Sequence, residues 1–311
     1  MAAFFRKADH ANTDLLSNYA WYVPGIGGMF LMLGLLLLGA LLGSLLVGAV
    51  AMATGLRASG DWSTLLSYPV MFIPPMLAAG NISMRNAVFE NGYKLDSRHF
   101  GRLGGAIVAL LCMAATFALA FCMDAVNALM PPMPEWLEGA LKQMTQGNIW
   151  INLLCVSIFA PFFEEWLCRG IVLRGLLNYK RTDAEGNAVR GLKPWVTIVI
   201  SALFFAAIHL NPWQAIPAFA LGCLFGWVYY KTGSLKLTML MHCTNNTLAV
   251  LMSRVEGWEN AENWTDIMSK TAYGILFGVA ILFLAYFYLE VNKIQTATPQ
   301  GNCDEITGSG E

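Results

Sequence analysis

Long apolar runs recur along this 311-residue chain, and each is about as long as the roughly 20 residues that cross a bilayer as a helix. Hydrophobic residues make up 57% of the sequence and charged residues only 13%, whereas a soluble domain carries about 25% charged residues. A backbone in lipid must satisfy its own hydrogen bonds, and a helix does so within a single segment. The sequence therefore predicts an all-α, polytopic membrane helix bundle whose main partner is the lipid bilayer.

Eight membrane-spanning helices are expected from the positions of these runs. We place them at residues 24–53, 63–84, 103–129, 149–178, 195–210, 213–230, 235–253 and 272–292. Between the third and fourth spans, the polar stretch 131–148 carries an apolar stripe that predicts a short helix lying in the membrane interface. The tail after the last span is polar, which favours disorder.

The distribution of Lys and Arg predicts the orientation of these spans, because cytoplasmic loops carry an excess of both. With the N-terminus in the cytoplasm, thirteen of the 19 Lys and Arg residues fall in cytoplasmic segments and four fall outside. The remaining two, Arg169 and Arg174, lie within the fourth span. We therefore expect both termini to be cytoplasmic. The formal net charge of −1 argues against a nucleic-acid partner.

Three ionisable residues interrupt the fourth span, in the stretch FAPFFEEWLCRG at 159–170. A charge at the centre of a membrane helix costs about 2.5–3.5 kcal/mol on insertion scales, so such groups usually pair, face water or do chemistry. Glu165 and Arg169 are four residues apart, so they share a helix face and can form an ion pair. Glu164 points about 100° away, because a helix has 3.6 residues per turn. We expect Glu165 to be paired and Glu164 to remain free.

Two more apolar spans carry polar side chains of complementary chemistry. His209 follows Phe205 at the end of the fifth span, and His242 and Asn246 share one face of the seventh. A carboxylate next to an imidazole can take a proton from water, and an imidazole with a carboxamide can donate hydrogen bonds to an oxyanion. Together with Glu164 these residues suit hydrolysis of an amide or ester. The alternative is a zinc site formed by Glu164, His209 and His242, since two histidines and one glutamate hold zinc in some hydrolases.

The three sequence patterns EEWLCR, FAAIH and HCTNN resemble the EExxxR, FxxxH and HxxxN motifs of the CAAX protease and bacteriocin-processing family. This family, also called the abortive-infection family, includes the CAAX prenyl endopeptidase, and its members are described both as metalloproteases and as metal-independent glutamate proteases. The resemblance covers about residues 150–250. It implies an intramembrane endopeptidase acting on a peptide or membrane-protein substrate, with or without an attached lipid.

Carried over by position, the resemblance gives each motif residue a role. Glu164 would activate water with help from His209, and His242 and Asn246 would form the oxyanion hole. Supporting roles would fall to the residues Glu165, Arg169 and Phe205. We favour the metal-free mechanism and expect no cofactor, because an Asn carboxamide is better suited to donate to an oxyanion than to bind zinc. Zinc stays the alternative.

The resemblance also implies a division of the chain and a location. Residues 1–148 would hold the first three spans and the interfacial segment, 149–253 the protease core, and 254–311 the last span and a disordered tail. The bacteriocin-processing members imply the bacterial cytoplasmic membrane. Two other functions use the same residues: a non-catalytic bacteriocin-immunity or peptide-binding protein, and a transporter whose ionisable groups line an ion path.

The predicted spans place the proposed catalytic side chains at different depths in the membrane, so the fold must bring them to one level. The fifth span, 195–210, has only 16 residues, about 24 Å of helix. Straight parallel helices would therefore leave Glu164, His209 and His242 at different levels in the membrane. We expect either tilted helices or a hairpin of the fifth and sixth spans that stops short of the far membrane face.

Overall fold

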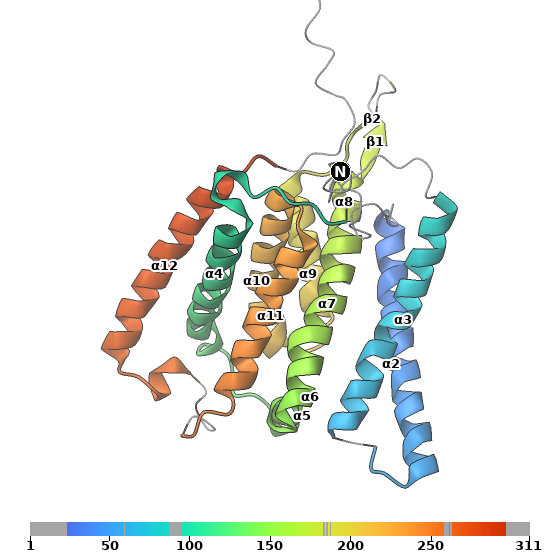
Figure 1. Ribbon diagram of the computed structural model, residues 1–311, viewed down its shortest axis with the longest axis vertical. Coiled ribbons are helices and arrows are strands. Elements are labelled where there is room, and N and C mark those ends of the chain that lie inside the picture. Colours follow the sequence, from blue (N-terminus) through green and yellow to red (C-terminus); the bar gives the residue numbers. More distant parts are fainter. Residues whose placement is uncertain are drawn as a thin grey trace, which may run out of the picture.

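The computed structural model describes residues 24–296 apart from 59, 87–94, 183, 185, 187, 258–260 and 262. Most of the described chain is helical (Figure 1). The elements are α2 (Ile26–Thr54), α3 (Asp61–Asn86), η2 (Gly101–Leu103), α4 (Gly104–Asn127), α5 (Glu135–Gln146), α6 (Ile149–Asn152), η3 (Leu153–Phe159), α7 (Ala160–Glu165), η4 (Trp166–Leu173), α8 (Arg174–Asn178), α9 (Pro194–Ala207), α10 (Pro212–Thr232), α11 (Leu235–Met252), η5 (Trp264–Asp266) and α12 (Lys270–Asn292). Residues 297–311 of the predicted disordered tail and both termini lie outside the described residues.

Five helical segments of the described chain are long and apolar enough to cross a membrane. They are Ile26–Thr54, Asp61–Ile82, Gly101–Asn127, Ile149–Asn178 and Lys270–Asn292. The protein is therefore an integral membrane protein with an all-helical bundle. The other three expected spans correspond to α9, which is short, and to α10 and α11, which are more polar. The eight crossings and the cytoplasmic termini stay predictions.

The helices lie side by side and run in alternating directions along one axis (Figure 1). A short antiparallel hairpin, β1 (Lys180–Thr182) with β2 (Ala188–Arg190), joins α8 to α9 and marks what we call the hairpin end of the bundle. The α10–α11 turn and the residues before α4 lie at this hairpin end. The predicted interfacial helix is present as α5, and it lies at the opposite end, together with the α9–α10 turn (Figure 1).

The turn between α9 and α10 explains how a short helix serves the site. Helix α9 has 14 residues, and the chain reverses through Leu210, which adopts a positive φ of 58°. The side chain of Asn211 then caps α10 by accepting a hydrogen bond from the Gln214 N–H at 2.9 Å, and Pro212 occupies the first turn. The sequence HLNPW therefore ends one helix and starts the next, forming the hairpin that was one of the two arrangements expected from the depth mismatch.

Helices α2 and α3 form a close pair at one flank of the bundle (Figure 1). Gly39 and Gly43 of α2 lie against the α3 backbone, where a Cβ on Gly39 would be 2.1 Å from the Met71 carbonyl oxygen and one on Gly43 would be 2.9 Å from that of Ser67. Small residues spaced by four let membrane helices approach closely. This contact holds α3, which carries Tyr68, against α2.

Replacing Gly39 by leucine is expected to separate α2 from α3 and to destabilise the protein by about 1–3 kcal/mol or more, the usual cost of overpacking. Gly34→Leu is the matched control, because a Cβ on Gly34 of the same helix meets no atom within 4 Å. Thermal unfolding in detergent measures both variants. Equal stabilities for the two would contradict the close contact.

Candidate active site

Glu164 and Glu165 end the short helix α7, between two π-helical segments of one continuous helix. The segment η3 precedes α7 and η4 follows it, so the ladder of backbone hydrogen bonds changes on both sides of the acidic pair. π-Helical turns are rare in proteins and are often found at functional sites. The Ser201 hydroxyl on α9 donates to the Cys168 carbonyl of η4 at 2.8 Å and so attaches α9 to this irregular stretch.

The predicted ion pair between Glu165 and Arg169 is present and fully buried. Arg169 Nη1 donates to Glu165 Oε1 at 2.7 Å, and the side chains of both residues have no exposed surface. Arg169 Nη2 donates to the Gly222 carbonyl of α10 at 3.1 Å. The guanidinium also lies 4.5 Å from the Phe205 ring centroid and 5.4 Å from that of Phe225. The pair therefore joins the fourth span to α9 and α10.

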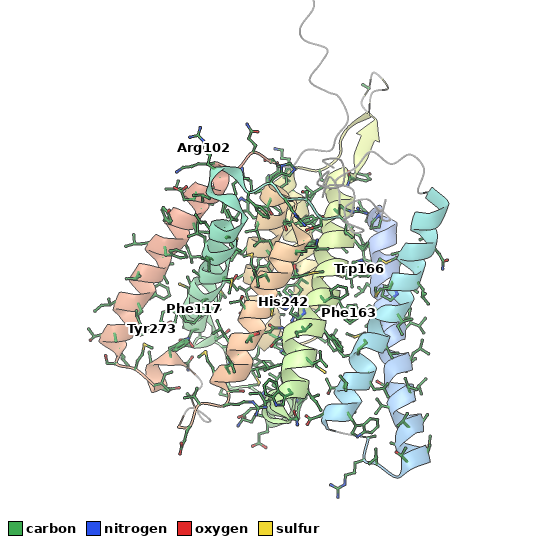
Figure 2. The ribbon with its side chains drawn as sticks, in the orientation of Figure 1. Arg102, Phe117, Phe163, Trp166, His242 and Tyr273 are labelled. Atoms are coloured by element: carbon green, nitrogen blue, oxygen red, sulfur yellow. The ribbon has the colours of Figure 1, made fainter. Side chains whose placement is uncertain are left out.

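His242 of α11 lies between the two glutamates. Its Nδ1 is 3.1 Å from Glu165 Oε1 and its Nε2 is 3.9 Å from Glu164 Oε2. Glu165 Oε1 also accepts from Arg169, so a hydrogen bond at the His242 contact would be donated by Nδ1–H. The other ring nitrogen, Nε2, then faces Glu164. Figure 2 shows His242 in the middle of the bundle, between the hairpin end, where Arg102 lies, and the opposite end.

Glu164 is held on one oxygen and open on the other, which differs from the expectation of a wholly free carboxylate. Its Oε1 accepts a hydrogen bond from the Tyr68 hydroxyl of α3. Its Oε2 is buried and has no hydrogen-bond partner among the described residues. The side chain is 13% exposed, whereas that of Glu165 is fully buried. Tyr68 therefore orients the carboxylate and leaves one oxygen for a ligand.

Sequence reasoning missed Tyr68. The residue lies in the second predicted span, and its hydroxyl is a polar group at membrane depth. A search for ionisable groups passes over a tyrosine, because its phenol is neutral near pH 7. The only sequence signal was a hydroxyl beside Pro69 in an apolar run, and such a signal names no partner.

His209 lies in the turn after α9, and its ring is oriented by the backbone. Its Nδ1–H donates to the Phe205 carbonyl at 2.8 Å, which leaves Nε2 as the ring nitrogen that faces away from the backbone. The Phe205 ring packs edge-on against both imidazoles, with centroids 5.1 Å from His209 and 5.3 Å from His242. No hydrogen bond or ion pair joins His209 to Glu164 in the described part of the chain, where the imidazole nearest Glu164 belongs to His242.

Asn246 is attached to the irregular helix through a carbonyl that lacks its usual partner. In the π-helical ladder the Ala160 N–H donates to the Cys155 carbonyl, so the Val156 carbonyl would pair with residue 161. That residue is Pro161, which has no N–H. Asn246 Nδ2 donates to the Val156 carbonyl instead, at 2.8 Å. One N–H of the carboxamide is thus used structurally, and the second remains for a ligand.

The predicted catalytic side chains line one cavity of about 590 Å³, within the range of ligand pockets. Its walls come from α2, α3, α4, α5, the fourth span, α9, α10 and α11. The polar side chains that line it include Tyr68, Glu164, His209, His242, Asn245 and Asn246. Glu165 and Arg169 do not line the cavity, and they support the residues that do. The fold therefore brings Glu164, His209, His242 and Asn246 together.

The zinc alternative would use the same three side chains. His242 Nδ1 contacts Glu165 and His209 Nδ1 contacts a backbone carbonyl, so a metal would be bound by the Nε2 atoms of both rings. Within the described residues, no group of three or more His, Cys, Asp or Glu side chains is arranged to hold a metal ion. Glu164, His209 and His242 therefore line the same cavity without forming a ligand set, and no step below uses a metal.

One known protein family matches the middle of the chain. The family model for type II CAAX prenyl endopeptidase Rce1-like proteins matches residues 146–248. This stretch is an Rce1-like domain. The match confirms the family resemblance predicted from the three motifs. The Rce1-like domain contains Glu164, His209, His242 and Asn246, whereas Tyr68 lies outside the matched residues. No curated protein and no solved structure matches the chain.

Arg169→Met is expected to destabilise the Rce1-like domain by about 3–5 kcal/mol, because it leaves Glu165 buried without a counter-charge. The double variant Glu165→Gln/Arg169→Met removes both charges and should recover much of the loss. Lys142→Met is a surface control, since Lys142 pairs with Glu138 at an exposed site. Thermal unfolding in detergent compares the four proteins. If Arg169→Met unfolded at the same temperature as the double variant or higher, the unpaired Glu165 charge would not be destabilising.

Proposed function

We propose that this protein is an intramembrane endopeptidase that hydrolyses a peptide bond of a peptide or membrane-protein substrate. The Rce1-like domain supports a membrane protease, and the arrangement of side chains suits water activation. One observation carries the proposal: the unpartnered Oε2 of Glu164 faces His242 Nε2 across 3.9 Å at the wall of a cavity.

A single water molecule suits this gap. A polar contact longer than about 3.5 Å is often bridged by water. The water would donate one hydrogen to Glu164 Oε2 and the other to His242 Nε2, leaving its lone pairs for a substrate carbonyl carbon. Tyr68 fixes the carboxylate through its other oxygen, and Glu165 fixes the imidazole through Nδ1. Both acceptors of the water are therefore preorganised by buried partners.

The reaction then follows ordinary general acid–base chemistry. Glu164 takes one proton as the water oxygen bonds to the carbonyl carbon, and the carbonyl oxygen becomes an oxyanion. Glu164 next gives that proton to the leaving nitrogen as the C–N bond breaks. The products are a new carboxyl terminus and a new amino terminus, and the enzyme returns to its starting protonation state.

Two groups remain to stabilise the oxyanion and support proton transfer. The second N–H of Asn246 is available, and a preorganised donor of this kind is worth about 10²–10³ in rate. His209 presents Nε2 to the cavity and can accept a proton from substrate or water. We keep the predicted assisting role for His209 and the donor role for Asn246. In this scheme His242 Nε2 accepts from the water, whereas the oxyanion role that the resemblance implies for His242 would need a hydrogen on Nε2.

The proposal also includes the surrounding architecture. The protein would cross the membrane eight times with cytoplasmic termini, and residues 149–253 would form the protease core between the N-terminal spans and the last span. The bacteriocin-processing members of the family favour the bacterial cytoplasmic membrane. Identifying the cleaved protein would show whether the substrate carries a lipid.

Glu164→Gln is expected to lower cleavage at least about a hundredfold, because an amide cannot accept the proton of the attacking water. The matched control is Glu138→Gln on α5, which changes an exposed carboxylate outside the cavity. Terminal peptides from membranes of cells carrying each protein measure the effect, through new termini that vanish only with Glu164→Gln. Unchanged termini together with a retained cellular phenotype would favour the peptide-binding protein, and ion flux in liposomes would favour the transporter.

Activity is expected to survive removal of divalent metals, because in the proposed reaction Glu164 and His242 activate the water without a metal. Purified protein treated with a chelator should cleave at the untreated rate, and elemental analysis should find no stoichiometric zinc. Loss of activity on chelation with recovery on adding zinc alone would replace the water-activating glutamate with a metal mechanism.

A further inference from the structure

We propose that Asn245 is a positioning residue for the reaction, because it holds the Asn246 carboxamide in the orientation that leaves an N–H for the oxyanion. This inference rests on the proposed proteolytic function, in which Asn246 is an oxyanion donor. It adds a residue that the HxxxN pattern leaves unspecified. Two observations support it: the direction of a chain of hydrogen bonds that ends beside Pro161, and the place of Asn245 in the cavity wall.

The Val156 carbonyl fixes the orientation of the Asn246 side chain. Its oxygen lies 2.8 Å from Asn246 Nδ2, and the π-helical ladder gives it no backbone donor because Pro161 has no N–H. A carbonyl oxygen can only accept a hydrogen bond, so the NH2 end of the carboxamide must face it. The oxygen end of Asn246 is therefore directed to a different neighbour.

Asn245 is that neighbour. Its Nδ2 donates to Asn246 Oδ1 at 3.1 Å, and no other group among the described residues donates to this oxygen. Turning the Asn246 carboxamide by 180° would place its oxygen against the Val156 carbonyl and its NH2 against the NH2 of Asn245. Both contacts would then be repulsive, so the two neighbours select the same orientation.

The hydrogen bonds form a chain that runs in one direction. Asn245 donates to Asn246, and Asn246 donates to Val156 of the fourth span. Hydrogen bonds in such a chain polarise and strengthen one another. Because the chain ends on the helix that carries Glu164, it fixes the oxyanion donor relative to the base that activates water.

Asn245 takes part in this chain from the wall of the cavity. It lines the cavity together with His242, Asn246 and Ala249, which occupy one face of α11. Its own oxygen and its second N–H have no hydrogen-bond partner in the part of the chain that the structure describes. The side chain is only partly buried, so a replacement of similar size leaves the packing between helices in place. The role of Asn245 can therefore be separated from the stability of the fold.

Loss of the Asn245 donor should affect the reaction step more than substrate binding. Asn246 Oδ1 would lose its donor, and the carboxamide could then turn away from the orientation that serves the oxyanion. Such a donor stabilises the charge that develops in the transition state, and it must be in position before the reaction. An interaction made only in the transition state lowers kcat when it is lost and leaves KM nearly unchanged.

Two replacements of Asn245 test this role in purified protein, with a peptide that spans a cleavage site lost in Glu164→Gln as the substrate. Asn245→Leu removes the donor, and Asn245→Asp keeps the size but places a carboxylate, which can only accept, against Asn246 Oδ1. We expect each to lower kcat about tenfold or more while KM stays within about twofold. Thr244→Val is the matched control, because the Thr244 hydroxyl donates to the Leu240 carbonyl of its own helix. Thermal unfolding checks that every variant is folded.

The same replacement in an Asn246→Ala background separates positioning from a general structural role. Asn246→Ala itself should lower kcat about a hundredfold, the usual loss for one oxyanion donor. If Asn245 acts through Asn246, adding Asn245→Leu should then change kcat by less than about twofold. An equal loss in both backgrounds, or an Asn245→Asp protein as fast as wild type, would overturn the inference.

The inference and the proposed function fail in different ways. Glu164-dependent cleavage that keeps its full rate in both Asn245 variants would remove Asn245 from the mechanism and keep the protease. The absence of any terminus that depends on Glu164 would overturn the proposed function, and with it the role of Asn245.

Discussion

The buried contact among Arg169, Glu165 and His242 is the interaction on which the site depends. A charged guanidinium in an apolar bundle is tolerable only when a carboxylate, backbone carbonyls and aromatic faces surround it. Here Glu165 neutralises Arg169 and at the same time accepts from His242. This single carboxylate oxygen therefore fixes the positions of the fourth span and α11 together. Glu164, one residue earlier, is left to face the cavity with an oxygen that has no partner among the described residues.

Irregular backbone is what lets a membrane helix present such a site. Two π-helical segments flank the acidic pair, and Pro161 leaves the Val156 carbonyl without its donor. The Asn246 side chain supplies that hydrogen bond, so α11 is attached to the fourth span at a second point. Helices α10 and α11 are not among the segments that qualify as membrane spans by composition. In α11, the polar residues that lower its hydropathy include His242, Asn245 and Asn246 of the cavity lining.

The α2–α3 pair completes the site from outside the Rce1-like domain. Tyr68 reaches Glu164 from α3, and Phe72 stacks on Phe163 of the fourth span with centroids 4.9 Å apart. Close packing at Gly39 places α3 for both contacts. The matched family region therefore carries the predicted chemistry, while the N-terminal helices orient its carboxylate and contribute a wall of the cavity. An enzyme built this way depends on helices that a motif search does not include.

The sequence by itself determined the helical membrane class, the family motifs and the Glu165–Arg169 pair, because long apolar runs and i,i+4 spacing act locally. The 16 residues of the fifth span also predicted either tilted helices or a short hairpin, and the structure contains the hairpin. Only the tertiary structure decided that Tyr68 contacts Glu164, that His242 is the nearer imidazole, and that one cavity gathers the catalytic candidates. These contacts join residues far apart in the chain, and their positions depend on helix packing, which no local pattern of residues encodes.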